Sequence, residues 1–150
     1  MRVVIQRVSE ASVRVGDEQI SRIGRGILAL AAFSRGDSEA ELQWMAGKII
    51  SLRVFEDADG KMNLSLQDIG GEILIVSQFT LYGDCRKGRR PGFDKSAAPA
   101  QAQDLYDRFV KILERESPGP VAEGVFREHM HVSLVNDGPV TLIVDKEPAE

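Results

Sequence analysis

An unbroken apolar run at residues 27–33, Ile-Leu-Ala-Leu-Ala-Ala-Phe, constrains the fold of this chain more than any other feature. The run lacks the alternation of a half-exposed strand, and it predicts a strand that is covered on both faces. Turn residues bound it, with Gly24 and Gly26 before it and a polar loop at 34–37 after it. The rest of the chain must therefore supply structure to both sides of this strand.

Most of the remaining chain reads as strand. The segment from Glu72 to Thr80 is the most strand-like, and the turn residues Gly70 and Gly71 precede it. Asn136-Asp137-Gly138 is a strong signal for a tight hairpin turn, which predicts a final hairpin. The expected extended segments are 3–8 continuing at 12–15, then 19–23, 27–33, 53–56, 61–66, 72–80, and a hairpin of 129–135 with 139–145.

Two segments have helical periodicity instead. Ser38 and Glu41 form a capping-box pattern that predicts a helix over 38–51. Pro99 is tolerated in a first turn, and the apolar spacing that follows predicts a second helix over 98–116. Strands with two helices indicate one α+β domain over residues 1–150, with a largely antiparallel, barrel-like core and the helices outside.

Composition and charge limit the cellular location and the kind of partner that this chain can have. Hydrophobic residues make up 43% of the chain, yet no apolar run is long enough to cross a membrane. The single cysteine, Cys85, has no internal disulfide partner, which predicts a reducing, cytoplasmic location. Because the net charge is -4, an anionic partner must be met by a local patch. Residues 86–92 provide such a patch, with the cations Arg86, Lys87, Arg89 and Arg90.

The usual catalytic residues are scarce. His129 and His131 share one face of a predicted strand, but no third metal ligand is obvious, and solvent-facing histidines are the simpler interpretation. Cys85 has cationic neighbours, as reactive cysteines often do, although a lone loop cysteine is more often inert. The turn at 57–60 has only a faint likeness to a calcium loop. We therefore expect no metal and no cofactor.

Two short stretches stand out instead. At Ser77-Gln78-Phe79-Thr80 an apolar strand abruptly turns polar, and sites in strand-based folds commonly lie at such ends. In the second stretch, 136–141, Pro139 stands where the return strand of the hairpin should begin, although proline cannot donate to a sheet. Each stretch also has a plain structural interpretation, as a strand end or a turn.

Together these stretches resemble the D-aminoacyl-tRNA deacylases. The likeness rests on SQFTL at 77–81, RKGRRPGF at 86–93 and NDGPVT at 136–141, and it extends to VIQRVSEASV at 4–13, LRVFEDADGKMNLSL at 52–66 and MHVSLVNDGPVT at 130–141. It spans nearly the whole chain. The resemblance implies a homodimer that hydrolyses the ester of D-aminoacyl-tRNA, and of glycyl-tRNA formed on tRNA-Ala, with no cofactor and no membrane partner.

The resemblance also assigns roles to residues. Ser77, Gln78, Phe79 and Thr80 match the segment that lines the pocket. Gly138 and Pro139 match a motif with a cis peptide bond, inserted from the partner subunit. The remaining matches are Arg7, which braces that motif, Met130, which borders the pocket, and the tRNA-binding residues Arg86, Lys87, Arg89 and Arg90.

An aminoacyl ester is already activated, so orientation and oxyanion stabilisation can supply most of the rate without a protein base. We therefore favour attack by water over attack by Thr80, because no base is adjacent to activate that hydroxyl. Carbonyls of the Gly-Pro motif that hold the substrate ammonium would reject an L side chain and admit glycine.

The chain departs from the family at two places. Phe-Gly-Ala is common where this chain has Phe126-Arg127-Glu128, which puts the local entry to the pocket in doubt, and LAAFSRGD at 30–37 differs from the glycine-containing version that is often seen there. Three alternatives stay open: a non-catalytic RNA-binding module, a purely structural homodimer, and a different small esterase.

Overall fold

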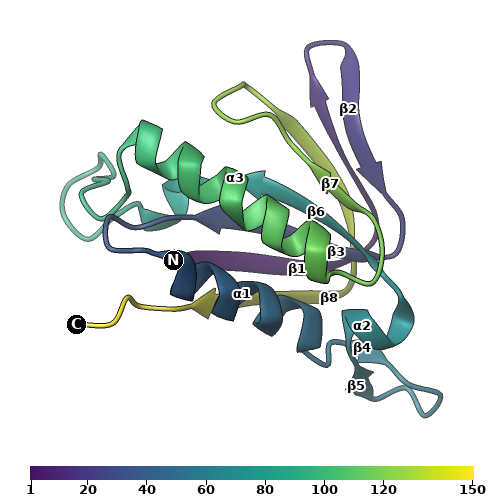
Figure 1. Cartoon of the computed structure of the whole chain (residues 1–150). Coiled ribbons are helices and arrows are strands. Elements are labelled where there is room, and N and C mark those ends of the chain that lie inside the picture. The colour runs from purple at the N-terminus through teal and green to yellow at the C-terminus, as the bar shows by residue number, and fades with distance from the viewer.

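The computed structural model describes residues 1–150, which form one large curled sheet with two long helices against one face, and a separate two-stranded sheet, β4-β5 (Figure 1). No helix is long and apolar enough to span a membrane. In chain order the elements are β1 (Arg2–Val15), β2 (Glu18–Ile23), β3 (Gly26–Ala32), α1 (Glu39–Ser51), β4 (Phe55–Glu56), β5 (Met62–Leu64), α2 (Leu66–Ile69), β6 (Glu72–Ser77), the 3-10 turn η1 (Phe79–Tyr82), α3 (Pro99–Glu116), β7 (Val121–Glu123) and β8 (His131–Asp145).

The main sheet has the strand order β2-β1-β3-β6-β7, and β8 pairs with β1 as well. The three partners of β1 all run antiparallel to it, which confirms a largely antiparallel, barrel-like core. The parallel pairs β3–β6 and β6–β7 were not anticipated. They arise because α1 and α3 lie in the connections that return the chain to the same end of the sheet.

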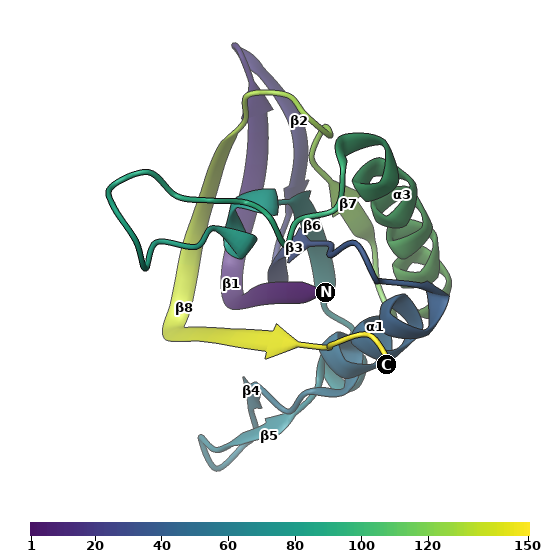
Figure 2. The ribbon, with the colours of Figure 1, turned by 90° about the vertical axis from the view of Figure 1, so that its left-hand side faces the viewer.

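The strand β3 is covered on both faces, as its unbroken apolar sequence predicts. Ile27, Ala29 and Ala31 belong to the core beneath α1 and α3. Leu28, on the opposite face, joins a smaller core inside the curl of the sheet, with Val8 of β1. Figure 2 shows the helices on one side and the curled strands on the other. One strand therefore separates two apolar cores.

Both long helices begin and end close to their predicted bounds. The Glu41 carboxylate accepts hydrogen bonds from the backbone N–H and the hydroxyl of Ser38, each at 2.7 Å, and these bonds lower the pKa of Glu41. Pro99 occupies the first turn of α3. Ser65 was expected to be extended, but it caps the short helix α2 by accepting the N–H of Asp68.

The predicted final hairpin is wrong. Residues 131–145 form the single strand β8, which runs antiparallel to β1 along nearly its whole length. Gln6 pairs with Thr141 and Val8 with Asn136, so residues 137–140 stand opposite Arg7 alone. These residues form a bulge, and Figure 2 shows both strands turning a corner there. The turn-forming residues thus bend a strand pair instead of reversing the chain.

The strand β6 also ends earlier than expected, at Ser77. The N–H of Gln78 donates to the carbonyl of Ala31 at 2.7 Å, and η1 follows at once. The alternation expected for residues 77–80 therefore does not apply, because Phe79 and Thr80 lie in a turn that leaves the sheet.

Candidate active site

A hollow of about 640 Å³ lies where β6 ends. Its walls come from the ends of β3 and β6, the start of α3, and the loop 124–130 that joins β7 to β8. Apolar residues make up more than half of the lining, as is usual for a ligand site. The lining residues are Ala32, Phe33, Val76, Ser77, Gln78, Phe79, Phe93, Ser96, Ala97, Pro99, Ala102, Phe126, Arg127, Glu128, His129, Met130 and Val132.

The turn η1 presents unpaired backbone donors beside this hollow. Its first hydrogen bond runs from the N–H of Leu81 to the carbonyl of Gln78, at 3.2 Å. The N–H groups of Phe79 and Thr80 precede that bond and have no acceptor in the turn. The Phe79 ring is 53% exposed and rests edge-on against Phe93, with ring centroids 5.0 Å apart. The segment thus offers an exposed aromatic surface next to free donors.

Thr80 itself has one side-chain partner. Gln78 donates an amide N–H to the Thr80 hydroxyl oxygen at 2.5 Å. No histidine, lysine or carboxylate is hydrogen-bonded to that hydroxyl, and Thr80 is not among the residues that line the hollow. The arrangement orients Thr80 but supplies no base to ionise it.

The two histidines of the chain lie together near this hollow. His129 lines the hollow and packs edge-on against His131, with ring centroids 5.2 Å apart. The structure assembles no group of three or more metal-binding side chains there or elsewhere.

Arg7 holds the corner between β1 and β8. Its side chain is only 7% exposed, and its guanidinium donates to the carbonyls of Asp137 at 2.7 Å and Val54 at 2.8 Å. Asn136 closes the bulge, since its side-chain oxygen accepts the N–H of Val140 at 3.0 Å. Within the bulge the Gly138-Pro139 peptide bond is cis and Gly138 has φ 146°. A buried, satisfied cation therefore fixes the main chain of this corner.

The corner does not reach the hollow of its own chain. Arg7 is level with Ile27 and Ile73, whereas the hollow opens at Ser77, four residues further along β6. Four residues of strand span about 13 Å, and β1 and β3 also lie between β8 and β6. The structure thus brings Ser77, Gln78, Phe79 and Met130 together, but not Arg7, Gly138 or Pro139.

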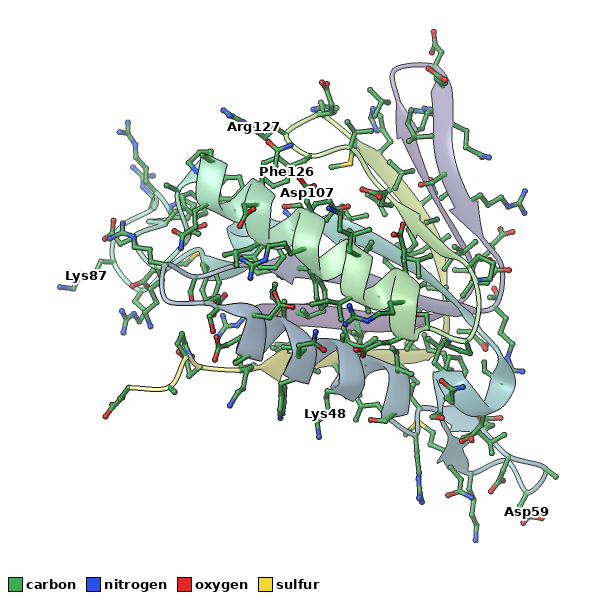
Figure 3. The ribbon with its side chains drawn as sticks, viewed as in Figure 1. Lys48, Asp59, Lys87, Asp107, Phe126 and Arg127 are labelled. Atoms are coloured by element: carbon green, nitrogen blue, oxygen red, sulfur yellow. The ribbon has the colours of Figure 1, made fainter.

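The basic segment forms an exposed loop that projects from the body (Figure 2). Hydrogen bonds of 2.7 and 3.0 Å between the backbones of Asp84 and Gly92 close it. Arg86 pairs with Asp84 at 2.6 Å, and this contact lowers the pKa of Asp84. The side chains of Lys87, Arg89 and Arg90 have no hydrogen-bonding partner within the chain, and Figure 3 shows Lys87 pointing outward.

The loop 124–130 was largely missed from the sequence. It is fastened to β6 by the N–H of Gly124, which donates to the carbonyl of Ile75 at 3.0 Å. Met130 shapes it from within, because its sulfur accepts the N–H of Val125 at 3.3 Å. The departure from the family pattern at Arg127-Glu128 was the one sequence signal that pointed to this loop.

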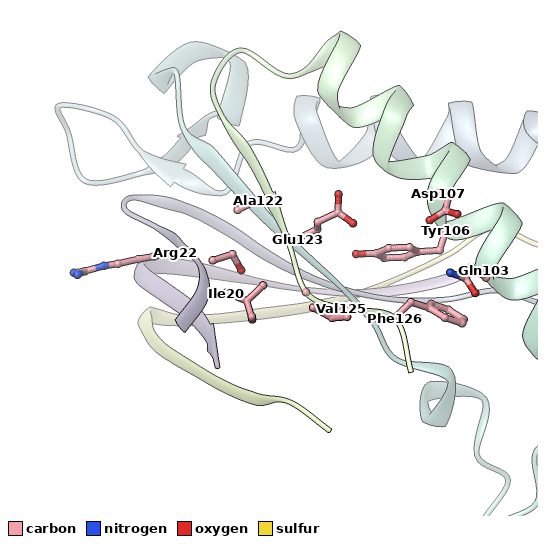
Figure 4. Close-up of a pocket in the computed structure, with 11 residues that line it drawn as sticks. Ile20, Arg22, Gln103, Tyr106, Asp107, Ala122, Glu123, Val125 and Phe126 are labelled. Carbon is pink, nitrogen blue, oxygen red and sulfur yellow. The ribbon is translucent and has the colours of Figure 1, made fainter. Parts of the chain in front are cut away.

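A second hollow, of about 580 Å³, lies beside the first between β2, β7 and α3 (Figure 4). Phe126 lines both hollows. Burial, together with the nearby carboxylates of Glu114 and Asp107, raises the pKa of Glu123. The Tyr106 hydroxyl is buried and donates to the carbonyl of Ile75 at 3.3 Å. Two carboxyl groups, Asp107 and Glu123, and one cation, Arg22, line this hollow.

Comparison with known proteins matches these features to a family. The model of the D-Tyr-tRNA(Tyr) deacylase family matches residues 4–145. The chain is 57% identical to a D-aminoacyl-tRNA deacylase of Chlorobaculum parvum, over 97% of each chain. It is 55% identical to one of Chloroherpeton thalassium, over 100% of this chain and 99% of that protein.

Two solved structures share the fold. A protein described as "c-Myc DNA Unwinding Element Binding Protein" is 44% identical, with a TM-score of 0.93 over 98% of this chain and 99% of that chain. A probable eukaryotic D-amino acid tRNA deacylase is 23% identical, with a TM-score of 0.82 over 97% and 98% of the two chains, and it supports the fold alone. By the match of its sequence from residue 4 to residue 145, this chain belongs to the D-Tyr-tRNA(Tyr) deacylase family.

Proposed function

We propose that this chain hydrolyses the ester that joins a D-amino acid to the 3′-terminal adenosine of tRNA. The observation that carries the proposal is the hollow at the end of β6, where two free N–H groups lie beside an exposed aromatic surface in a chain that matches curated deacylases along its whole length. Because the proposed substrate is a tRNA, we also propose that the reaction takes place in the cytoplasm. Glycyl-tRNA formed on tRNA-Ala is a second proposed substrate.

In the proposed reaction a water molecule attacks the ester carbonyl. The N–H groups of Phe79 and Thr80 stabilise the oxyanion, while Ser77 and Gln78 orient the adenosine or the water. The bond from the carbonyl carbon to the ribose oxygen then breaks, and that oxygen takes up a proton, with help from the neighbouring ribose hydroxyl. The products are the free amino acid and tRNA.

The competing mechanism makes Thr80 the nucleophile. The contact between Gln78 and the Thr80 hydroxyl and the absence of a bonded base argue against it. Thr80→Ala should therefore retain turnover. Loss of turnover with retained substrate binding, together with an acyl adduct trapped on Thr80 of the wild type, would show that Thr80 is the nucleophile.

We further infer that the site is completed by a second copy of the chain. The corner at Gly138-Pro139 is too far from its own hollow, and β8 has a free edge because it pairs only with β1. That strand also exposes Val135, Leu142 and Ile143, of which Ile143 is 68% exposed. A long, apolar, unpaired edge is typical of a surface that another chain covers.

Docking of β8 from a partner would bring the carbonyls of Gly138 and Pro139 to the amino group of the substrate. With the ammonium fixed there, an L side chain would collide with main chain, whereas the α-hydrogen of a D-residue would fit. Discrimination would then work by rejection, and glycine, which has no side chain, would pass. Arg7 would hold the corner in position through its bond to Asp137.

The exposed loop would bind the tRNA backbone. Lys87, Arg89 and Arg90 are free to approach phosphates, while Arg86 is already paired with Asp84 and shapes the loop as well. This loop, and a similar solved structure described as a DNA-binding protein, also favour a second candidate, a nucleic-acid-binding module without chemistry.

One experiment separates these functions. Purified protein is incubated with matched D- and L-aminoacyl-tRNA, and the release of the amino acid is measured. We expect fast release from the D form alone. Binding without release would support the module, and equal release of both forms would identify an esterase without chiral selection.

A further inference from the structure

Arg127 has an unusual backbone. Its φ is 67°, and it is the one residue other than glycine whose φ is positive. All the other residues with positive φ are Gly16, Gly60, Gly70, Gly88 and Gly138. A side chain disfavours this left-handed conformation because Cβ crowds the following carbonyl. Glycine would therefore suit position 127 better, and an arginine there suggests a use for its side chain.

The surrounding loop fixes this position firmly. The N–H of Glu128 donates to the carbonyl of Val125 at 3.2 Å, and the N–H of Val125 donates to the sulfur of Met130. Gly124 ties the loop to β6, the strand that leads into Ser77. The place of Arg127 relative to the end of β6 is thus set by main-chain hydrogen bonds and by the sulfur of Met130.

The side chain of Arg127 is available for a ligand. It is exposed, it makes no ion pair or hydrogen bond within the chain, and Figure 3 shows it projecting away from the ribbon. Among the residues that line the hollow it is the only arginine or lysine. Arg7 differs, because its guanidinium is buried and donates to two main-chain carbonyls.

A single anion on the proposed substrate lies next to the terminal adenosine. It is the phosphodiester that joins this adenosine to the preceding nucleotide. A guanidinium matches a phosphate with two parallel hydrogen bonds, and it keeps its charge at any physiological pH. We propose that Arg127 binds this phosphodiester at the rim of the hollow. The proposal rests on the proposed function, because it takes the adenosine to occupy the hollow.

The test uses substrates with and without the phosphodiester. Arg127→Gly should raise KM for D-aminoacyl-tRNA roughly 10-fold at low salt, as expected for a hydrogen bond between charged groups, with little change in kcat. The salt slope of binding should fall by about 1. The KM change should be confined to substrates that carry the phosphodiester, so D-aminoacyl-adenosine should not show it.

The same variant gives a second, opposite readout. Because glycine suits the left-handed conformation, Arg127→Gly should raise the midpoint temperature of thermal unfolding, although it weakens substrate binding. Arg127→Lys keeps the charge but loses the paired hydrogen bonds, so its KM should lie between that of the wild type and that of Arg127→Gly. The matched control is Arg115→Ala, which removes one exposed cation at the far end of α3 from the hollow.

A binding arm separates this proposal from the proposed function. A short RNA with the 3′-terminal tRNA sequence is titrated against both proteins, with the last linkage either native or a neutral methylphosphonate. We expect the neutral linkage to weaken binding to the wild type and to leave binding to Arg127→Gly unchanged. Equal losses in both proteins, or equal affinities of both proteins for the native RNA, would overturn the role of Arg127 even if no deacylation is found.

Discussion

The hollow at the end of β6 and the corner between β1 and β8 are built in opposite ways. The hollow is open, and its polar groups at residues 78–80 are exposed or have few partners. At the corner, Arg7 is buried and its hydrogen bonds are satisfied by main-chain carbonyls. The hollow has room for a substrate. At the corner, the carbonyls of Gly138 and Pro139 belong to a bulge that the hydrogen bonds of Arg7 hold in place.

The two regions suit different parts of the proposed reaction. Chiral selection needs a rigid surface that an L side chain cannot displace. Main chain that is held in place by a buried arginine provides such a surface. Ester hydrolysis needs solvent access and free donors, so it suits a strand end. The proposed site between two copies would bring the two regions together.

The largest expected effect is at Gly138. A Cβ at this position would lie 2.8 Å from the Val140 nitrogen and 3.1 Å from Arg7 Nη2, on a backbone with φ 146°. Gly138→Ala should therefore displace the corner and lower kcat/KM about 100-fold or more for D-aminoacyl-tRNA, as measured by release of the amino acid. The control is Gly47→Ala in α1, where a Cβ meets no atom within 4 Å and activity should not change.

A rigid corner also predicts a stability effect. Arg7→Met leaves the carbonyls of Asp137 and Val54 without their buried donor, which should lower the free energy of unfolding by about 2 kcal/mol in a urea titration. Arg22→Met, which removes an exposed ion pair with Glu10, should cost about 0.5 kcal/mol or less. Equal losses in the two variants would show that Arg7 does not hold the corner.

The exposed loop should affect binding and leave the fold intact. Replacement of Lys87, Arg89 and Arg90 by Ala should weaken tRNA binding about 10-fold at low salt and flatten its salt dependence, because up to three phosphate contacts are lost. Fluorescence anisotropy over a salt series measures both. If the salt dependence is unchanged, the loop does not contact the backbone of the tRNA.

The smallest expected effect is at Glu123, and it tests whether the second hollow takes part in the reaction. The pKa of Glu123 is raised in the folded state, so the folded chain binds more protons than the unfolded chain, and stability falls as pH rises above the ordinary carboxyl range. Glu123→Gln should raise stability at pH 7 by about 0.3 kcal/mol once solvent screening is allowed for, and the gain should vanish near pH 4. Turnover should be unaffected; a large loss of turnover would mean that the second hollow takes part.

The sequence predicted those parts of the fold that depend on local signals. The helices α1 and α3 were found because capping residues and apolar spacing act within a few turns. The burial of β3 followed from its composition alone. Tertiary pairing overrode local signals elsewhere. Asn136-Asp137-Gly138 was read as a hairpin turn, but pairing of β8 with β1 on both sides of these residues makes them a bulge.

The candidate site was predictable only in part. Ser77, Gln78 and Phe79 were visible as a polar end to an apolar strand, and Met130 through family resemblance. The contribution of residues 124–129 was indicated only by the departure from the family pattern at Arg127-Glu128, because the hydrogen bond that fastens this loop to β6 through Gly124 leaves no signal in the sequence. The second hollow was missed for the same reason, since β2, β7 and α3 meet only in the fold.

In the proposed site, the hollow of one chain works with the corner of another. Subunit complementation tests this directly, with the hollow variant Gln78→Ala and the corner variant Gly138→Ala, each of which we expect to be inactive alone. When the two are unfolded together and refolded as a mixture, half of the dimers contain both chains, and each of these has one intact site. We predict recovery of about a quarter of wild-type activity. No recovery, in a mixture that sedimentation shows to contain mixed dimers, would contradict the account and place both halves of the site in one chain.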